Sequence, residues 1–427
     1  MRMTVVGGGS TYTPELVDGF ARLRDLLPID ELVLVDPAAD RLELVGGMAR
    51  RMLARAGHPA TVTTTTDVDD GVRDADVVLL QLRVGGQAAR DRDETWPLEC
   101  GCVGQETTGA GGLAKALRTV PVVLDIAERV RRLAKPDAWI VDFTNPVGIV
   151  TRALLGAGHR AVGLCNVAIG FQRSFAQTLD VPPSRVRLDH VGLNHLTWIR
   201  GVHVADEDGA PGPDVLPGLL ADQGAELAGR VGIPERLVRE LGVMPSYYLR
   251  YYYCHDVVVA EQRMHGTRAA EVAAIERELL ALYADPTVDT KPELLEHRGG
   301  AYYSEAAVDL VASLRADRGD VQVVNVRNAG TLPFLPDDAV VEVPCRVGAG
   351  GAVPLAVPAL GPLYAGLVAH VSAYEELAVE AALHGGRERV VAALLAHPLV
   401  GQLDVAEGLA DLLLAENAAF LPWAAAA

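Results

Sequence analysis

The first 165 residues alternate between short apolar runs and longer amphipathic stretches, and this alternation limits the possible folds more than any other feature of the chain. The amphipathic stretches, such as Leu42–Ala56 and Val120–Leu133, repeat apolar residues at intervals of three and four, which predicts helices. The apolar runs, with one Thr-rich run among them, predict strands at residues 3–6, 31–35, 62–66, 75–82, 139–143 and 161–164. Continuous apolar strands separated by helices are typical of a parallel sheet covered on both faces. We therefore expect an α/β fold that begins with a Rossmann-type, doubly wound parallel sheet.

The pattern changes after about residue 166, where helical stretches dominate and a few apolar extended segments lie between them. Helices are predicted at residues 168–179, 216–231, 268–283, 302–314, 362–383 and 405–417. Strands are predicted at residues 186–191, 195–204, 321–326 and 339–344. No flexible linker rich in Ser, Pro or Gly separates the two halves. We expect two domains, residues 1–166 with the Rossmann-type sheet and residues 167–427 with a mixed α+β fold, packed against each other.

The charge and the cysteines exclude some classes of function. The chain carries 38 Lys and Arg against 56 Asp and Glu, a net charge of −18, which repels nucleic acids and anionic membrane surfaces. Five cysteines at irregular spacing do not form a disulfide framework and favour a reducing compartment. We expect a cytoplasmic globular protein that binds neither nucleic acid nor membrane.

One uncharged stretch, Val347–Tyr374, is long enough to span a bilayer. Pro354, Pro358 and Pro362 interrupt any helix there. We interpret it as a buried extended segment that leads into a core helix.

A glycine cluster follows the first predicted strand and precedes a helix, where a dinucleotide would bind. The residues proposed for this site are Gly7, Gly8, Gly9, Ser10, Thr11 and, at the end of the second strand, Asp36. Glycines permit a tight turn and close approach to a pyrophosphate, and the helix N-terminus supplies amide donors. A carboxylate at Asp36 would accept from a ribose diol and repel a 2′-phosphate, which favours NAD over NADP. Tyr12 replaces the third glycine of the usual pattern, so a purely structural turn remains an alternative, as does an ordinary turn role for Asp36.

Polar residues also follow the later strands, where a dinucleotide module alone would not need them. Gly104–Gly109 forms a polar loop, and Asn145, Cys165 and Asn166 come at strand ends, which line the ligand crevice of such a sheet. Cys165 together with His195 can hold a divalent metal, although a core cysteine and a packed histidine are the alternative.

Five of the eleven tyrosines lie in residues 247–253. An aromatic core or a dimer interface explains most of them, but one phenol beside a metal and a cation can act as a base. Arg90 and Arg268 lie in polar surroundings that favour contacts with an anion.

Taken together, these clusters resemble glycoside hydrolase family 4, the NAD- and metal-dependent glycosidases. The resemblance runs through most of the chain: the Gly7–Tyr12 loop, residues 83–86, Gly104–Gly109, Asn145-Pro146, Cys165-Asn166, Gly192–His195, the tyrosine cluster and residues 298–303. It implies a Rossmann-type NAD-binding domain followed by a domain for substrate, metal and oligomerisation. This family departs from the usual pair of catalytic carboxylates in glycosidases.

The resemblance also implies roles for individual residues. Cys165 and His195 would be the protein ligands of Mn²⁺, with sugar oxygens completing its shell. Tyr248 would be the catalytic base, and Glu106 the acid that raises its basicity. Substrate contacts would come from Arg90, Asn145, Asn166 and Arg268, the two arginines holding a 6-phosphate.

Asn166 narrows the expected substrate. Family members that act on 6-phospho-α-glucosides resemble Cys-Asp at this point, and those that act on 6-phospho-β-glucosides resemble Cys-Asn, as found here at Cys165-Asn166. An amide cannot donate the leaving-group proton, so that donor stays unassigned. Ala168 replaces the proline that usually follows Cys-Asn-Val.

We therefore expect NAD- and Mn²⁺-dependent hydrolysis of a phosphorylated β-glucoside by a homodimer or homotetramer. Within the family, a 6-phospho-α-glucosidase or an α-galactosidase is the alternative. Outside it, an NAD-dependent 2-hydroxyacid dehydrogenase, suggested by Asn145-Pro146-Val147, and a catalytically silent NAD sensor remain open.

Overall fold

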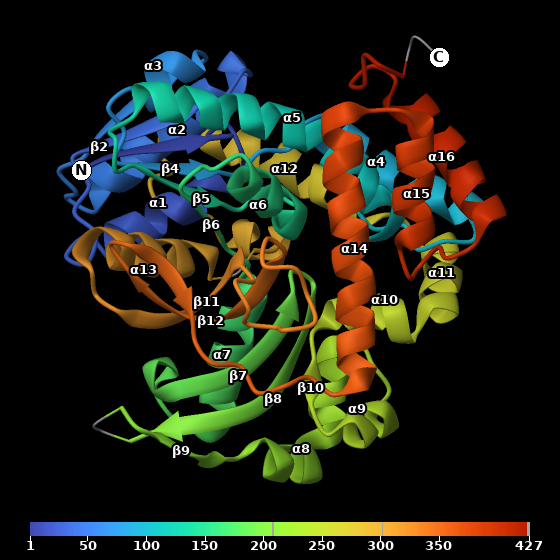
Figure 1. Cartoon of the computed structure of the whole chain (residues 1–427). Helices are drawn as coiled ribbons and strands as arrows, with labels where there is room; N and C mark the ends of the chain where they lie inside the picture. Colours follow the sequence, from blue (N-terminus) through green and yellow to red (C-terminus); the bar gives the residue numbers. More distant parts are fainter. Residues whose placement is uncertain (207–208, 301, 425–427) are drawn as a thin grey trace.

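A nine-stranded sheet forms the centre of the computed structural model, which describes residues 1–206, 209–300 and 302–424 (Figure 1). Six strands are parallel, in the order β3-β2-β1-β4-β5-β6. They are β1 (Arg2–Val6), β2 (Glu31–Val35), β3 (Thr61–Thr65), β4 (Val77–Leu80), β5 (Trp139–Asp142) and β6 (Ala161–Gly163). This is the strand order of a doubly wound dinucleotide-binding sheet, so the predicted fold class is confirmed.

Helices cover both faces of this sheet. One group packs together on one face: α1 (Thr13–Arg22), α2 (Ala39–Arg55) and α13 (Tyr303–Ala316). The other group contains α3 (Val68–Val72), α5 (Gly109–Leu133), α6 (Val147–Gly156) and α14 (Pro362–His384). Helix α5 begins at Gly109, eleven residues before the predicted start at Val120. Its first residues include Gly111 and Gly112, where a Cβ would lie 2.4 and 2.7 Å from neighbouring backbone atoms. Close backbone packing therefore replaces the apolar periodicity in this part of the helix.

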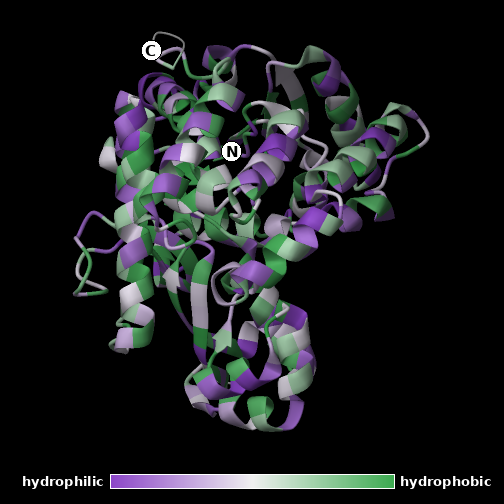
Figure 2. Cartoon of the chain, turned by 90° about the vertical axis from the view of Figure 1, so that its right-hand side faces the viewer, coloured by the Kyte–Doolittle hydropathy of each residue, from purple (hydrophilic) through white to green (hydrophobic). Residues whose placement is uncertain are grey.

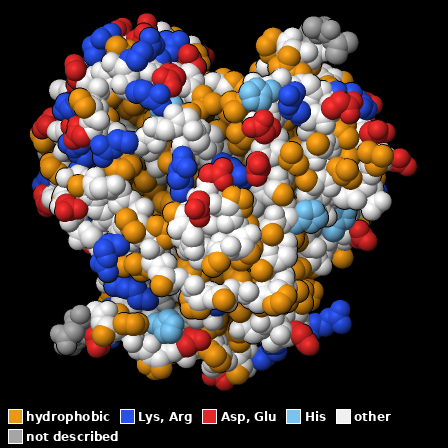
Figure 3. Space-filling model, in the orientation of Figure 1, with side chains coloured by type: hydrophobic (Ala, Val, Ile, Leu, Met, Phe, Trp, Pro, Cys, Tyr) orange, Lys and Arg blue, Asp and Glu red, His pale blue; other side chains and the backbone are white. Residues whose placement is uncertain are grey.

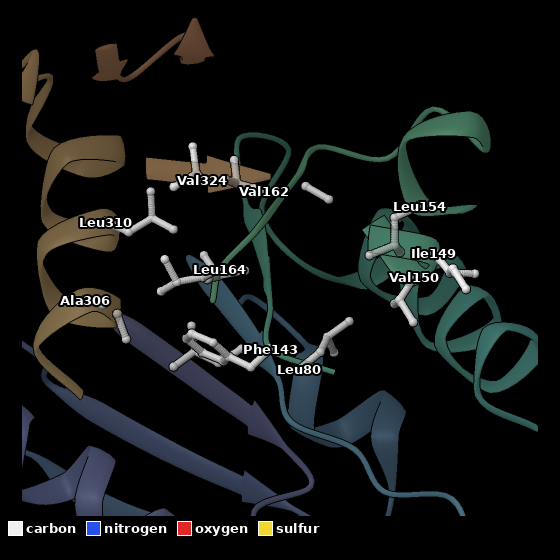
Figure 4. Close-up of a cluster of buried hydrophobic side chains, with 14 of the residues drawn as sticks. Leu80, Phe143, Ile149, Val150, Leu154, Val162, Leu164, Ala306, Leu310 and Val324 are labelled. Atoms are coloured by element: carbon white, nitrogen blue, oxygen red, sulfur yellow. The ribbon is translucent and has the colours of Figure 1, made fainter. Parts of the chain in front are cut away.

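The core explains why the strand ends are held in place. Leu80, Phe143, Leu164 and Val162 lie between α13, which contributes Ala306 and Leu310, and α6, which contributes Ile149, Val150 and Leu154 (Figure 4). All of these side chains are buried. Burying one such side chain is worth about 1.5–3 kcal/mol. The core thus clamps the carboxyl ends of β4, β5 and β6 from both faces.

The second half of the chain extends the same sheet. Strands β11 (Asp320–Arg327), β12 (Val340–Gly348) and β13 (Gly351–Pro354) continue it in antiparallel fashion, with Asn325 opposite Gly163 of β6. The main sheet therefore crosses the expected boundary between residues 166 and 167, and the division into two domains there stays a prediction.

A second, smaller sheet lies in the lower part of Figure 1. Its strands are β7 (Val186–Leu193), β8 (Leu196–Ala205), β9 (Pro211–Asp214) and β10 (Met244–Pro245), and β7 packs against β12 of the main sheet. Around it lie helices α7 (Asn166–Leu179), α8 (Leu216–Val231) and α9 (Glu235–Leu241). The mixed α+β character predicted for the second half is confirmed.

The remaining helices complete the molecule. They are α4 (Gly86–Thr95), α10 (Arg250–Tyr253), α11 (His255–Met264), α12 (Arg268–Ala284), α15 (Arg387–Ala396) and α16 (Leu403–Asn417). The outer helices carry hydrophilic and hydrophobic residues side by side, as amphipathic cover requires (Figure 2). All six helices predicted in the second half are present, although the first residue predicted for the fourth, Tyr302, is instead its N-cap.

The uncharged stretch Val347–Tyr374 is extended and then helical, as predicted, but it is not buried. Val353 and Leu363 are each 64% exposed, and most residues from 349 to 367 are half-buried or exposed. The expectation of burial was wrong because β13 is the edge strand of the main sheet and the first turn of α14 lies at the surface, with Leu363 exposed. Within the part of the chain that the structure describes, no helix combines the length and apolarity needed to cross a membrane.

Candidate active site

A cavity of about 340 Å³ lies at the carboxyl ends of β1, β2 and β4, lined by Gly7, Ser10 and Asp36 among others. The Gly7 and Gly8 amides donate to the Val35 carbonyl oxygen at 2.8 Å, which folds the loop back onto β2. Gly7 has φ +87°, and a Cβ there would lie 2.6 Å from the Gln81 carbonyl oxygen. Only glycine fits at this position, where the loop packs closely against the end of β4.

Asp36 and Thr11 make different contacts with this loop. The Asp36 carboxylate accepts from the amides of Gly9 and Ala38, at 3.1 and 3.0 Å, at the edge of the cavity. Thr11 is fully buried, and its hydroxyl bonds to Glu276 and Arg298. Thr11 therefore fixes the loop from behind, as the buried backbones of Gly8 and Gly9 do, while Ser10 and Asp36 face the cavity.

A second cavity, of about 420 Å³, brings together residues that are far apart in the sequence. Seven of the predicted site residues line it: Arg90, Glu106, Asn145, Asn166, His195, Tyr248 and Arg268. Five residues line both cavities: Tyr12, Arg83, Asn145, Arg298 and Tyr303. A ligand in the second cavity therefore lies beside a ligand in the first.

His195 lines the second cavity, whereas Cys165 does not and instead lines a third cavity, of about 1210 Å³. Cys165 is the N-cap residue of α7 and is 3% exposed, and the Asn194 amide donates to its thiol. His195 is buried with φ +63°, and its Nδ1 has no hydrogen-bond partner within the described residues. Glu342 accepts from Asn194 at 3.0 Å and so anchors the segment that carries His195.

The ionisation of these two groups follows from their burial. Burial and the nearby Glu342 carboxylate raise the pKa of the Cys165 thiol. Burial lowers the pKa of His195 to about 4, so its imidazole is neutral. An unpartnered neutral imidazole beside a thiol fits a divalent cation that takes further ligands from a substrate. The described residues contain no set of three His, Cys, Asp or Glu side chains that would enclose a metal without such ligands.

Tyr248 lies directly against this pair. Its ring stacks on the His195 ring, with centroids 3.7 Å apart and planes 15° from parallel. Burial, followed by the neighbouring Tyr247 and Cys165, raises the pKa of Tyr248 well above its usual value. A phenol in this state donates a proton readily only when a positive charge is placed near its oxygen.

Glu106 sits among three cations. Lys115 Nζ lies 2.6 Å and Arg90 Nε 3.0 Å from its carboxylate oxygens, and Arg83 donates to both of them. Burial alone would raise the pKa of Glu106, but Arg83, Lys115 and Arg90 together hold it well below its usual value. Glu106 is therefore a fixed negative charge in the wall of the second cavity.

The predicted anion-binding residues differ in their surroundings. Arg90 is 12% exposed and shared between Glu94 and Glu106, whereas Arg268 is 47% exposed at the first turn of α12, where it also donates to the His297 carbonyl. Asn145 Oδ1 is buried and has no hydrogen-bond partner among the described residues, so it is available to a ligand. Charges of both signs are interspersed on the face in Figure 3, so the acidic excess does not exclude a local cationic site.

Sequence reasoning assigned no role to several residues of this wall. Lys115 is 3% exposed and lines the dinucleotide cavity, and Arg298 donates to Thr11 Oγ1 at 2.8 Å and to Glu276 at 3.0 Å. One signal for Lys115 was available, since the chain has only three lysines and this one lies in an apolar helix. Arg83 and Arg298 belong to segments that carried the family resemblance.

Comparison with known proteins identifies the family. A model of the "Family 4 glycosyl hydrolase" matches residues 2–181, and a model of the "Family 4 glycosyl hydrolase C-terminal domain" matches residues 190–400. The chain belongs to glycosyl hydrolase family 4. The resemblance found from the sequence motifs is confirmed.

Individual members of family 4 are similar over nearly the whole chain. A Bacillus subtilis protein described as "Probable 6-phospho-beta-glucosidase" is 41% identical, covering 99% of this chain and 97% of its own length. The structure of the 6-phospho-β-glucosidase from Thermotoga maritima with manganese, NAD⁺ and glucose-6-phosphate superposes with a TM-score of 0.88, at 34% identity, and covers 98% of this chain and 99% of that one. The phospho-α-glucosidase of Clostridium acetobutylicum is 30% identical over 97% of each chain.

Proposed function

We propose that this family 4 enzyme hydrolyses 6-phospho-β-glucosides and requires NAD and a divalent cation, with Mn²⁺ as the expected ion. The observation that carries the proposal is the common wall of the two cavities, to which Asn145 belongs. It would place a bound sugar beside a bound nicotinamide, and a 6-phospho-β-glucosidase relative holds all three ligands. The dehydrogenase and sensor alternatives fit less well, because they need neither the Cys165–His195 pair nor a stacked tyrosine.

The residues present fit both cofactors. The Gly7 turn and the Asp36 carboxylate would hold the pyrophosphate and the adenine ribose of NAD. Cys165 and His195 would hold the cation, since an unpartnered imidazole nitrogen and a thiolate are donors for divalent metals, and sugar oxygens would supply the oxygen ligands that suit Mn²⁺. When bound, NAD supplies a reversible hydride acceptor for C3 and the cation supplies positive charge beside the C2 and C3 oxygens.

The protein's own residues would then orient the sugar and move one proton. Arg268 and Arg90 bind the 6-phosphate, and Asn145 accepts a hydrogen bond from a sugar hydroxyl through Oδ1. Once C3 is at the ketone level, the proton on C2 is acidic, and the Tyr248 oxygen takes it. The aglycone leaves from C1 by elimination, water adds to the conjugated ketone, and the return of hydride to C3 gives 6-phosphoglucose.

The β-configuration is favoured by Asn166, which follows Cys165 at the start of α7 and lines the substrate cavity. Sequence identity favours the same configuration, since it is 41% to a chain described as a probable 6-phospho-β-glucosidase and 30% to a phospho-α-glucosidase. A 6-phospho-α-glucosidase or α-galactosidase is the alternative within the family.

Paired 6-phospho-α- and 6-phospho-β-glucosides, each with and without NAD⁺ and Mn²⁺, test the proposal. We expect hydrolysis of the β-substrate only with both cofactors, and deuterium at C2 of the product in D₂O. Hydrolysis of the unphosphorylated glucoside alone, or a product without deuterium at C2, would contradict it. Stoichiometric NADH release would favour a dehydrogenase instead.

We also propose that the enzyme works in the cytoplasm as a homodimer or homotetramer. All five cysteines are free, which suits a reducing compartment. The exposed uncharged residues of β13 and the start of α14 suit contact with a second copy. Sedimentation equilibrium would give the oligomeric state directly, and a monomer at micromolar concentration would contradict this part.

A further inference from the structure

Three stacked rings run from the metal-binding pair to the outside of the substrate cavity. The His195 and Tyr248 rings are 3.7 Å apart, and the Tyr248 and Tyr247 rings are 4.2 Å apart at an angle of 30°. Tyr247 is the outermost ring of this series and lines the cavity. The series therefore gives the cavity a direction, from His195 inwards to Tyr247 outwards.

Tyr247 is unusually exposed for an aromatic residue in a packed wall. It is 45% exposed, while the leucine two positions later in the same 3₁₀ segment is fully buried. Aromatic side chains usually bury their faces, and an exposed face inside a cavity is a surface on which a flat apolar group can stack.

The position of a bound sugar follows from the proposed function, on which this inference rests. The C2 and C3 oxygens lie at the cation held by His195, and the C2 proton faces Tyr248. Carbon C1 is the next ring atom beyond C2, so its substituent points away from C3 and along the series toward Tyr247. The group that leaves from C1 is the aglycone.

We propose that Tyr247 is the platform of the aglycone subsite, on which the flat face of a ring attached to C1 stacks. The wall next to it is aromatic, since Tyr248 and Tyr251 line the cavity beside it, with ring centroids 6.2 Å apart. The favoured aglycone is therefore a group with a flat face, either an aryl ring or the apolar face of a second pyranose. An aglycone as small as methyl does not reach the Tyr247 ring.

Tyr247→Ala and Tyr247→Phe, assayed with three 6-phospho-β-glucosides, test this platform in the holoenzyme. The aglycones are methyl, phenyl and a β-1,4-linked glucose. With Tyr247→Ala we expect KM to rise about three- to tenfold for the phenyl and disaccharide substrates, the size of one aromatic stacking contact, and to stay unchanged for the methyl substrate. Tyr247→Phe keeps the ring and should leave all three KM values unchanged. A rise for phenyl alone would assign the subsite to aryl groups, and a rise for the disaccharide alone would assign it to sugars.

A second measurement separates the platform from a general effect on the neighbouring Tyr248. Without NAD⁺ the substrates bind but are not consumed, so calorimetry gives Kd directly, and Tyr247→Ala should weaken phenyl and disaccharide binding by the same factor as KM. An equal loss for all three substrates, or no change for any, would overturn the platform. Failure of the wild-type enzyme to hydrolyse even the methyl substrate with both cofactors would instead overturn the proposed function.

Discussion

The two cavities that meet at Asn145 are built in different ways. The glycine turn of the dinucleotide cavity takes its shape from one short loop, in which the Gly7 and Gly8 amides both bond to Val35, although residues from distant segments also line the cavity. The substrate cavity takes its chemistry from side chains on many separate segments, and its central carboxylate, Glu106, depends on Arg83, Arg90 and Lys115. The first is determined by local backbone geometry and the second by long-range charge balance.

This difference predicts which changes each cavity tolerates. Backbone geometry is sensitive to added atoms but carries little charge that a mutation can unbalance. A buried charge network is instead sensitive to the loss of a charge, because removing one ion-pair partner leaves the remaining buried charges uncompensated. The four predictions below test that contrast, and their expected effects decrease in size.

The largest effect is expected for Tyr248→Phe. The phenol oxygen is the only atom removed, and the ring can still stack on His195. Loss of a general base typically lowers kcat by about 10²- to 10⁴-fold, and we expect a fall in that range in steady-state assays. The Kd for NAD should not change, because Tyr248 is not part of the dinucleotide cavity.

Tyr252→Phe is the matched control. Its hydroxyl bonds to Thr108 at 3.0 Å behind the cavity, so the same atom is removed from the same cluster without touching the site. If both variants lowered kcat equally, the tyrosine cluster would have a structural role and Tyr248 would not be the base.

The next effect concerns stability. Glu106→Gln removes the charge that compensates Lys115, which is itself 3% exposed with a pKa lowered to about 8 by burial and Arg83. Breaking a buried ion pair on one side costs about 3–5 kcal/mol, and we expect a loss of that order in urea unfolding monitored by circular dichroism. Glu416→Gln breaks the exposed pair with Arg92 and should cost under about 1 kcal/mol. Similar losses in the two variants would show that Glu106 is not buried among cations in solution.

A third effect contrasts Glu106 with Glu375, a buried carboxyl on α14 whose Oε2 has no hydrogen-bond partner among the described residues. Burial raises the pKa of Glu375 from 4.5 to about 8, with only a small opposing effect of Arg152. The folded state therefore holds a proton that the unfolded chain releases, and this contribution to stability is present below pH 4.5 and lost as the pH rises through 8.

Glu375→Gln removes that pH dependence. Relative to the wild type, the variant should be unchanged near pH 4.5 and more stable by up to about 3 kcal/mol at pH 7, measured as urea unfolding at each pH. A difference between the two proteins that does not vary with pH would mean that Glu375 is ionised in the folded state.

The sequence predicted the fold well where the signal is local. Five apolar runs and one Thr-rich run located the six parallel strands, and apolar periodicity located α2, α7, α12 and α14. It did not predict that β11 adds to β6, because Asn325 and Gly163 meet through a long-range antiparallel pairing that no local pattern records. It also misjudged the exposure of residues 349–367, since an uncharged segment on an edge strand reads like a core segment.

In the site, too, local features were predicted from the sequence and long-range contacts were not. The Gly7 turn and Asp36 were found from the sequence because the residues that make them are neighbours. Seven residues of the second cavity lay in segments that the sequence had already singled out, the family resemblance implied their roles, and the structure places them together. Lys115 and Arg298 were assigned no role, because the contact of Arg298 with Thr11 joins residues 287 positions apart. A single sequence does not reveal the long-range contacts that hold the site together.

The smallest effect tests the local side of the comparison. Asp36→Asn keeps an oxygen for the Gly9 or Ala38 amide but removes the charge that would repel a 2′-phosphate. We expect the preference for NAD over NADP, measured as the ratio of Kd values by fluorescence titration, to fall about tenfold, or about 1.4 kcal/mol. Glu31→Gln is the control, because it removes one charge from the other end of the same strand, where Glu31 pairs with Arg2. At that distance the charge is largely screened, so the ratio should not move. If it moved as much as with Asp36→Asn, net charge rather than the ribose contact would set the cofactor preference, and the dinucleotide cavity would depend on long-range charge just as the substrate cavity does.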